Sequence, residues 1–238
     1  MRKRSGKYIY PFKFQDMFLE TICILQGEIQ NREGHQERMQ RTASHFGFKA
    51  PGLPDLLSLL ATELQISAEE LRDTGGLQNI KDGIRGVTGQ RQGSKVKCRI
   101  VYHESIREIS FERYIPKLIT SLKLVEASLD YSFKLADRSS LNDLLLQKGT
   151  CDEILITRNG FITDTSYSNV VLSRGEQFFT PENPLLNGTK RQKLLREGFI
   201  MEKAIHRDSL REYDRIYLIN AMLDIEDNIS LSVLNVIY

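Results

Sequence analysis

The chain of 238 residues has no tryptophan and only three cysteines, and the shortage of cysteine excludes the most. Cys23, Cys98 and Cys151 lie far apart with no Cys-x-x-Cys pair, which argues against a disulfide framework and against a cysteine zinc site. No apolar run approaches the roughly 18 residues that cross a membrane. Sparse, unpaired cysteines are typical of a reducing compartment, so we expect a cytoplasmic protein that does not insert into a membrane.

An excess of charge of either sign is also missing, because 33 basic residues face 31 acidic residues for a net charge of +2. This near balance gives no expectation of nucleic-acid binding, although the chain opens Met-Arg-Lys-Arg. No apolar segment follows that basic start, so we expect no secretory signal. The histidines show no metal-ligand spacing, and we expect no bound metal ion. They are His35, His45, His103 and His206.

Two frequent site signatures are absent as well. Six glycines between positions 75 and 93 mark a loop, but Gly89-Gln-Arg-Gln-Gly93-Ser-Lys lacks the Gly-Lys-[Ser/Thr] order that places a lysine on nucleotide phosphates. No Gly-x-Ser-x-Gly segment marks a hydrolase nucleophile.

The first half of the chain reads as strands and helices in alternation. The turn pair Gln26-Gly27 joins two short strands over 18–30, and Pro54 suits the first turn of a leucine-rich helix. A capping box lies at 67–70. The other expected elements are a helix over 34–46 and strands over 95–102 and 106–114.

The second half is richer in strands. Alternating apolar residues from Leu122 predict a strand that ends near Lys134, and the Asn159-Gly160 pair predicts a hairpin turn. The other expected elements are strands over 152–157, 169–172 and 215–220 and helices over 141–147 and 188–197. We therefore expect a mixed α+β chain in two domains that meet near 113–120, where Pro116 lies. The predicted domains are a small N-terminal α/β domain over 1–115 and a larger β-rich domain over 116–238.

The stretch from Lys134 to Arg191 carries an amine, a carboxylate and a glycine-led helix start in order. Lysine forms a covalent imine with an aldehyde when its amine is neutral, and partial burial favours that form. The carboxylate of Asp164 would keep a pyridine nitrogen protonated. These groups match pyridoxal 5′-phosphate. Taken singly, Lys134 could be a strand-end lysine in solvent, and Asp164 a turn residue bonded to its own backbone.

The remaining group of this cofactor is its phosphate. Gly188-Thr189 opens an expected helix, whose free N–H groups and dipole favour an anion, and the threonine hydroxyl adds a donor. Arg38, on an earlier expected helix, could fork onto phosphate oxygens. Each has an ordinary alternative: a loop glycine before a surface helix, and an arginine on a solvated helix face.

Four motifs in this order resemble the class IV aminotransferases, the fold-type IV group that includes D-amino-acid and branched-chain aminotransferases and aminodeoxychorismate lyase. The resemblance spans about 14–224. The motifs are Phe18-Leu-Glu20 with Gly27 and His35-x-x-Arg38-Met, then Lys134-Leu-Ala-Asp137-Arg138, then Ile162-Thr-Asp164-Thr-Ser-x-Ser-Asn169-Val, then Leu186-Asn-Gly188-Thr189-Lys-Arg191.

The resemblance implies a role for each motif. Lys134 would be the Schiff-base lysine, and Arg38 would bind the phosphate. Asp164 would replace the family's ring-nitrogen glutamate, which is one methylene longer. The other implied cofactor contacts are Asn169, Gly188, Thr189 and Asn220. The resemblance also implies a D-amino-acid-aminotransferase-like, two-domain fold-type IV enzyme that forms a homodimer.

The chain departs from the family's pattern at its start. It is expected to begin late and to lack most of the usual first hairpin, and 14–17 reads Phe-Gln-Asp-Met where the family has Phe-Gly-Asp-Gly. The substrate-side and dimer-edge contacts made there are therefore not predicted.

Two reactions fit this cofactor. Asn187-Gly188 and the run Asn220-Ala-Met222 resemble the lyase branch, which eliminates pyruvate from 4-amino-4-deoxychorismate and leaves 4-aminobenzoate. The alternative is a transaminase acting on D-amino acids or branched-chain L-amino acids. Arg99 and Arg107, on expected strands, are candidates for binding the carboxylate of an amino-acid-like substrate. A non-catalytic nucleic-acid-binding module is disfavoured by the near-neutral charge.

Overall fold

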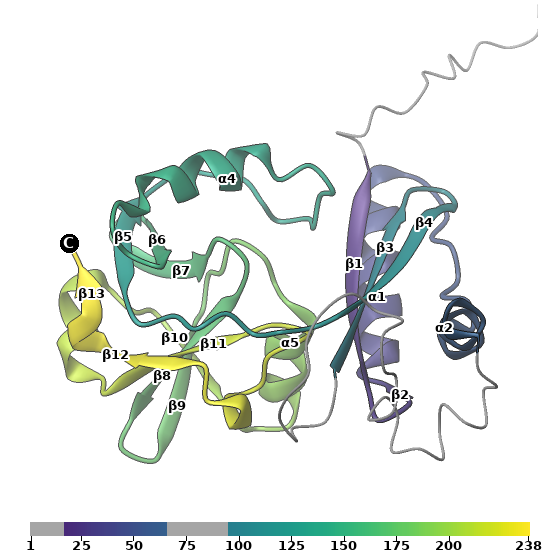
Figure 1. Ribbon diagram of the computed structural model, residues 1–238. Helices are drawn as coiled ribbons and strands as arrows, with labels where there is room; N and C mark the ends of the chain where they lie inside the picture. Colours follow the sequence, from purple (N-terminus) through teal and green to yellow (C-terminus); the bar gives the residue numbers. More distant parts are fainter. Residues whose placement is uncertain (1–16, 66–94) are drawn as a thin grey trace, which may run out of the picture.

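Two β-sheets organise the described chain, residues 17–65 and 95–238 of the computed structural model (Figure 1). The first sheet has the strand order β2-β1-β3-β4, and the second has nine strands. All strands of the first sheet precede Leu122, where the second sheet begins. The expected capping box at 67–70, the glycine-rich stretch at 75–93 and the motif at 14–16 lie outside the described residues.

The first sheet and its helices have these bounds: β1 Phe18–Leu25, β2 Glu28–Ile29, β3 Lys95–Tyr102, β4 Ile106–Arg113, α1 Arg32–Phe46 and α2 Leu56–Leu64. The strands of the second sheet are β5 Leu122–Glu126, β6 Glu153–Arg158, β7 Phe161–Thr165, β8 Asn169–Arg174, β9 Gln177–Pro181, β10 Met201–Lys203, β11 Arg215–Ile219, β12 Ser230–Ser232 and β13 Val236–Ile237. Its helices are α4 Ser139–Leu145 and α5 Thr189–Arg196, with 3₁₀ turns η2 Leu146–Lys148, η3 Arg207–Glu212, η4 Ile225–Asp227 and η5 Val233–Asn235.

One face of the first sheet packs against helices, and the other borders a cavity. Side chains alternate along a strand, so the pairing of β1 with β3 sorts them by parity. Ile22 and Cys98 pair on one face and share a hydrophobic cluster with Met39 of α1 and residues of α2. The opposite face carries Thr21 paired with Arg99, and this face borders the cavity described below.

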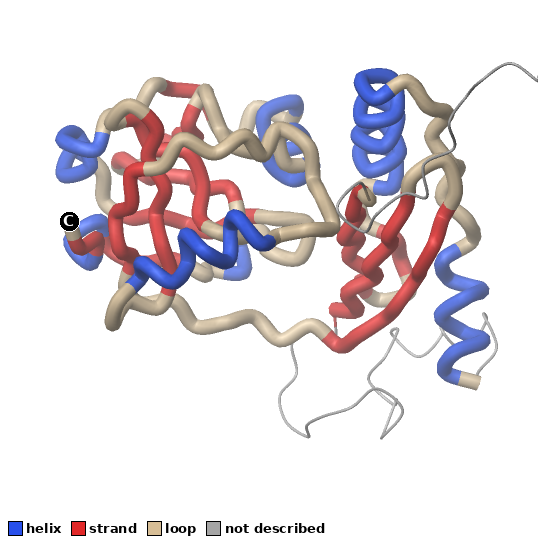
Figure 2. The backbone as a smooth tube through the Cα atoms, turned by 90° about the horizontal axis from the view of Figure 1, so that it is seen from above, coloured by secondary structure: helices blue, strands red, loops and turns tan. Residues whose placement is uncertain are grey.

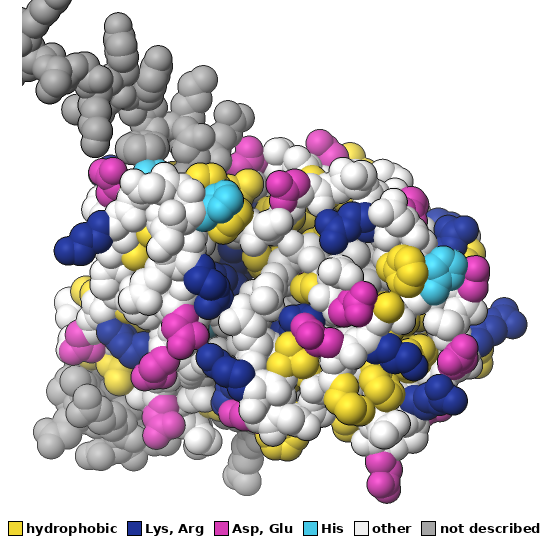
Figure 3. Space-filling view, turned by 180° about the vertical axis from the view of Figure 1, so that it is seen from behind, with side chains coloured by type: hydrophobic (Ala, Val, Ile, Leu, Met, Phe, Trp, Pro, Cys, Tyr) yellow, Lys and Arg dark blue, Asp and Glu magenta, His cyan; other side chains and the backbone are white. Residues whose placement is uncertain are grey.

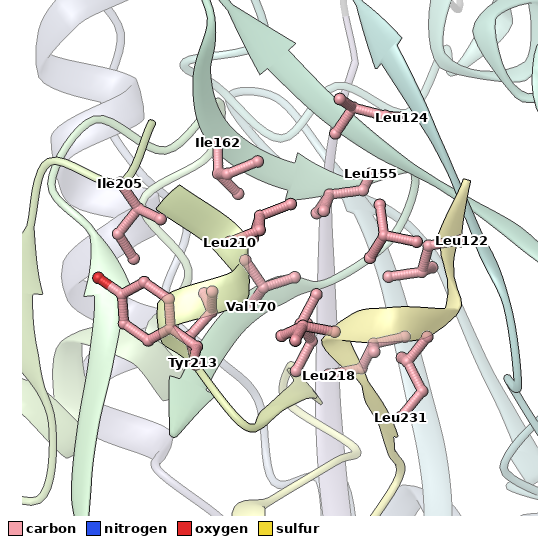
Figure 4. Packing of buried hydrophobic residues seen from close by; sticks show 14 of the residues in the cluster. Leu122, Leu124, Leu155, Ile162, Val170, Ile205, Leu210, Tyr213, Leu218 and Leu231 are labelled. Carbon is pink, nitrogen blue, oxygen red and sulfur yellow. The ribbon is translucent and has the colours of Figure 1, made fainter. Parts of the chain in front are cut away.

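The second sheet surrounds the larger hydrophobic core (Figure 4). Leu155, Val170 and Leu218 come from β6, β8 and β11 and are fully buried there. The predicted hairpin joins β6 to β7, and Asn159 (φ 54°) and Gly160 (φ 78°) both adopt the positive φ that such a two-residue turn requires.

Two local expectations were wrong. The strand expected to end near Lys134 ends at Glu126, because the Asp130 side chain accepts hydrogen bonds from Ser132 N (3.1 Å) and Oγ (2.8 Å) and turns the chain locally. Pro54 lies outside its helix, since Asp55 is the N-cap and accepts from Ser58 N at 3.2 Å.

The loop that carries Lys134 is anchored on the other sheet instead. Leu19 N donates to the Lys134 carbonyl at 2.8 Å, and Ala136 N donates to the Met17 carbonyl at 2.8 Å. Phe18 and Leu135 form an isolated β-bridge between these bonds. Figure 1 shows the loop before α4 reaching toward β1, so the lysine lies where the two sheets meet.

The outer surface carries charges of both signs. Figure 3 shows basic and acidic side chains interspersed over one face. Seen from above in Figure 2, the helices lie around the outside of the two sheets. Among the helices of the described residues, none is long and apolar enough to cross a membrane.

Candidate active site

A cavity of about 240 Å³ lies where the first sheet meets β7, β8 and the start of α5. It brings together almost all the residues predicted to form the site. Those lining it are Arg38, Arg99, Lys134, Asp164, Asn169, Gly188, Thr189 and Asn220. Arg107, the other arginine candidate, is exposed on β4 and is not among the lining residues.

The amine of Lys134 enters the cavity from its anchored loop. Its Nζ donates to Thr21 Oγ1 at 3.2 Å, on the cavity face of β1. Burial, together with the nearby Arg38 and Arg138 charges, lowers the pKa of Lys134 to about 7 against the opposing effect of Glu20. A substantial neutral fraction at physiological pH therefore makes this amine a nucleophile and a base.

Asp164 is buried on the opposite side, near the end of β7. Its Oδ1 accepts from Asn169 Nδ2 at 2.7 Å, and its Oδ2 accepts from Leu186 N at 2.9 Å. Burial raises the pKa of Asp164 to about 6, while these donors and Arg191 act in the other direction. A cation placed beside this carboxylate would favour its ionised form.

Asn169 links the carboxylate to the start of α5. It pairs with Asp164 between β7 and β8, and its Nδ2 also donates to the Leu186 carbonyl at 2.8 Å. Its Oδ1 lies so close to Gly188 that a Cβ there would sit 2.1 Å away. Gly188, the N-cap of α5, is therefore required for close approach rather than for an unusual backbone angle (φ −66°).

The N-terminus of α5 faces the cavity with Gly188 and the buried Thr189. Asn31 Nδ2 donates to the Thr189 carbonyl at 3.1 Å, and Thr189 Oγ1 lies 3.5 Å from His35 Nε2. Helix α1 of the first sheet therefore supports the helix terminus that was predicted to bind phosphate.

Arg38 is oriented by a buried carboxylate. Its Nε donates to Glu20 Oε1 at 2.8 Å and its Nη2 donates to Glu20 Oε2 at 2.5 Å. Burial alone would raise the pKa of Glu20, but the charge of Arg38 and the hydrogen bonds from His35 and Arg38 outweigh it and lower the pKa to about 2. Glu20 is ionised, and it holds the guanidinium against the cavity.

Asn220 uses its side-chain oxygen to shape its own turn. Oδ1 accepts from Met222 N at 2.8 Å and from Leu223 N at 3.1 Å, so the turn presents Ala221 and Met222 to the cavity. Arg191 of α5 is buried. It donates to the Pro181 carbonyl (2.8 Å) and to Asn187 Oδ1 (3.0 Å) and thereby fixes the backbone that leads into Gly188.

Sequence patterns missed several residues that the structure brings into or beside the cavity. Thr21 and His35 lie inside the N-terminal motif, and the strand alternation around Glu20 is the signal that could have placed Thr21 on the cavity face. Lys97 lies two residues before Arg99 and therefore on the same face, where it forms an ion pair with Glu112. Other missed lining residues include Tyr114, Tyr131, Arg138 and Tyr167.

The contact between Gly188 and Asn169 predicts the effect of adding one methyl group. Gly188→Ala should displace the Asn169 side chain and destabilise the cofactor-free protein by about 1–3 kcal/mol, because an overpacked site must shift. Urea unfolding measures the loss. Gly52→Ala is the control, since nothing lies within 4 Å of its added Cβ. Equal stability of the two variants would contradict the proposed contact.

The raised pKa of Asp164 predicts a pH dependence of stability. The buried carboxyl is protonated more readily than in the unfolded chain, so its contribution is favourable at low pH and is lost as pH rises from about 3.8 to about 6. In the cofactor-free protein this loss is on the order of 3 kcal/mol. Asp164→Asn should remove it in urea unfolding between pH 4 and 7, whereas Asp143→Asn, at an exposed position, should leave it. A wild-type profile unchanged by Asp164→Asn would show that the group titrates normally.

Comparisons with known proteins agree with this geometry. The profile of the amino-transferase class IV family matches residues 17–226. An uncharacterised protein of Haemophilus influenzae is 34% identical over 205 residues, which cover 85% of this chain and 96% of that protein. The crystal structure of a protein provisionally named a 4-amino-4-deoxychorismate lyase, from Haemophilus somnus, has a TM-score of 0.68 at 32% identity, covering 91% of this chain and 98% of that one. A Schizosaccharomyces pombe protein provisionally named aminodeoxychorismate lyase is 23% identical over 214 residues, 85% of each chain. The family predicted from the motifs is confirmed, and the chain belongs to the class IV aminotransferases, pyridoxal-phosphate-dependent enzymes of fold-type IV.

Proposed function

We propose that this protein is a 4-amino-4-deoxychorismate lyase, which releases pyruvate from its substrate and leaves 4-aminobenzoate. The observation that carries the proposal is the turn at Asn220. Its carboxamide oxygen is committed to the turn, and Ala221 and Met222 face the cavity at a place where transaminases of the family often carry small hydroxyl residues. The similarity to the Haemophilus somnus protein supports the same reaction.

The residues of the cavity fit pyridoxal 5′-phosphate. An amine, a buried carboxylate and a helix N-terminus share one space, and Gly188 has no room for a side chain. Lys134 would hold the cofactor covalently and Asp164 would pair with its ring nitrogen. The groups that would hold its phosphate are Arg38, Gly188 and Thr189, and those beside its ring are Asn169 and Asn220. When bound, the cofactor supplies an aldehyde that captures amines and a ring that withdraws electrons.

Lys134 is the proposed acid and base of the reaction. With a pKa of about 7 its freed amine can take a proton from the substrate carbon that bears the amino group. The adjacent carbon–oxygen bond then breaks, its electron pair leaves with the enolate of pyruvate, and the lysine can return the proton to the methylene carbon of that enolate, which completes pyruvate. Thr21 Oγ1, 3.2 Å from Nζ, holds the amine beside the substrate between the two transfers. Asp164 stays ionised beside a cationic ring nitrogen.

A transaminase is the second candidate function, because the family profile covers both reactions. The same lysine would then move a proton between substrate and cofactor, and the amino group would remain on the cofactor. The two reactions differ in what an amino acid alone does to the holoenzyme.

A half-reaction assay distinguishes them. With D-alanine or L-leucine alone, the yellow holoenzyme should not accumulate the pyridoxamine form, whereas 4-amino-4-deoxychorismate should release pyruvate, followed by coupled lactate dehydrogenase. Lys134→Ala should abolish pyruvate release and the borohydride-reducible visible band. Lys123→Ala, which loses only a surface bond to the Tyr238 carbonyl, should keep both. Accumulation of the pyridoxamine form would establish the transaminase instead.

Arg99 is the proposed ligand of a substrate carboxylate. It pairs in register with Thr21, the residue that holds the lysine amine, so its side chain leaves β3 on the cavity face next to the reacting groups. Among the described residues its guanidinium has no hydrogen-bond or ion-pair partner. A substrate carboxylate near the reacting amine would supply that partner.

Removing this charge should weaken substrate binding more than it slows the reaction. We expect Arg99→Gln to raise KM by about 10- to 100-fold with a smaller change in kcat, the loss of one charged hydrogen bond. Arg107→Gln, an exposed arginine on the neighbouring strand, is the matched control and should behave as wild type. Steady-state pyruvate release measures both. Equal KM values for the two variants would remove Arg99 from the substrate site.

We also propose two domains, a cytoplasmic location and a homodimer. The break between the sheets, after Arg113 and before Leu122, supports domains over 1–115 and 116–238. The buried free thiols of Cys23, Cys98 and Cys151 support a cytoplasmic location. Family membership supports a homodimer, which sedimentation velocity would test.

A further inference from the structure

His35 connects the buried carboxylate to the helix terminus of α5. The ring is only 1% exposed, between β1 and α5. Its Nδ1 lies 2.6 Å from Glu20 Oε2, and its Nε2 lies 3.5 Å from Thr189 Oγ1. The two ring nitrogens of His35 therefore connect Thr189 with Glu20, and the proposed reaction gives this histidine no role.

The direction of these hydrogen bonds follows from the charge of Glu20. This carboxylate is ionised and can only accept, so His35 Nδ1 must carry a proton and donate it. In the neutral ring Nε2 is then an acceptor, and the Thr189 hydroxyl donates to it.

Phosphate binding at the N-terminus of α5 conflicts with that arrangement. This step rests on the proposed function, which places the cofactor phosphate against Thr189. The hydroxyl of Thr189 has one proton, whereas His35 Nε2 and a phosphate oxygen would both require it. A proton on Nε2 removes the conflict, because His35 then donates to Thr189 and Thr189 donates to the phosphate.

We propose that His35 takes up a proton from solvent when the cofactor phosphate binds at Thr189. His35 is thus a positioning residue: it orients the Thr189 hydroxyl toward the phosphate and adds a positive charge behind it. Glu20 provides the counter-charge on the far side of the ring, at 2.6 Å.

Burial and the neighbouring charges act on the pKa of His35 in opposite directions, with a lowered pKa as the net result. Burial lowers the pKa of His35, Glu20 raises it, and Arg38 of the same helix and Lys134 of the anchored loop lower it. Tyr102 of β3 stays neutral, because burial raises its pKa. A phosphate dianion held at Thr189 and Arg38 adds negative charge beside the ring, opposes the effect of the Arg38 charge on His35, and so favours the imidazolium.

Calorimetry of cofactor binding measures the proton directly. Apoprotein is titrated with pyridoxal 5′-phosphate at pH 8 in two buffers of different ionisation enthalpy, since the free phosphate group, with a second pKa of about 6, is already a dianion there. We expect wild type to take up close to one proton more than His35→Asn, whose amide can still donate to Glu20 but cannot titrate. The affinity of wild type should fall between pH 7 and 9 by at most about tenfold per pH unit, and that of His35→Asn should be weaker and less dependent on pH.

A second pair of variants leaves the histidine in place. Thr189→Val removes the hydroxyl at nearly constant shape and should abolish the extra proton, whereas Thr189→Ser should keep it. His206→Asn, at a histidine that is 41% exposed, is the control and should match wild type. The same proton uptake in wild type, His35→Asn and Thr189→Val would overturn the inference while cofactor binding stands. Failure of the wild-type chain to bind the cofactor would overturn this inference and the proposed function together.

Discussion

The site depends on a short backbone clamp between two parts of the chain that are more than 100 residues apart. The loop carrying Lys134 leaves the second sheet after β5 and is held by Leu19 N and by the Met17 carbonyl at the edge of β1. Backbone hydrogen bonds in a partly buried place are costly to leave unmade, so the loop is fixed there. This clamp brings the lysine amine beside Thr21 of the first sheet, while Asp164 lies on the second.

Two buried carboxyl groups on either side of the cavity show how hydrogen-bond and ion-pair partners set a pKa. Glu20 and Asp164 are both buried, but the pKa of Glu20 is lowered to about 2 and that of Asp164 is raised to about 6. The difference is the neighbouring cation: Glu20 receives a bidentate guanidinium, whereas Asp164 receives one backbone N–H and one amide. Glu20 is therefore ionised and anchors Arg38, whereas the carboxyl of Asp164 is protonated more readily than an ordinary aspartate.

Much of this arrangement could be predicted from sequence, because it lies in local patterns. The Asn159-Gly160 turn, the helix starting at Gly188 and the pairing of strands around Gln26-Gly27 follow from backbone preferences of a few residues. The end of the strand at Glu126 could not be predicted in this way. The alternation of apolar residues continues past Glu126, but the Asp130 side chain turns the chain there. Nor could the sequence show that Thr21 meets Lys134, a contact set by the clamp rather than by either segment alone.

The aspartate at position 164 also has a structural explanation that the motif could not provide. The family's usual glutamate is longer, and here the carboxylate is bonded to the Leu186 backbone while Gly188 lies against the Asn169 side chain. Leu186 N binds one oxygen, and Asn169 binds the other while its own Oδ1 presses on Gly188. A further methylene would push into this packed turn, whose position also fixes the N-terminus of α5. Asp164 and the N-terminus of α5 are therefore joined through Leu186 and Asn169 in one packing arrangement.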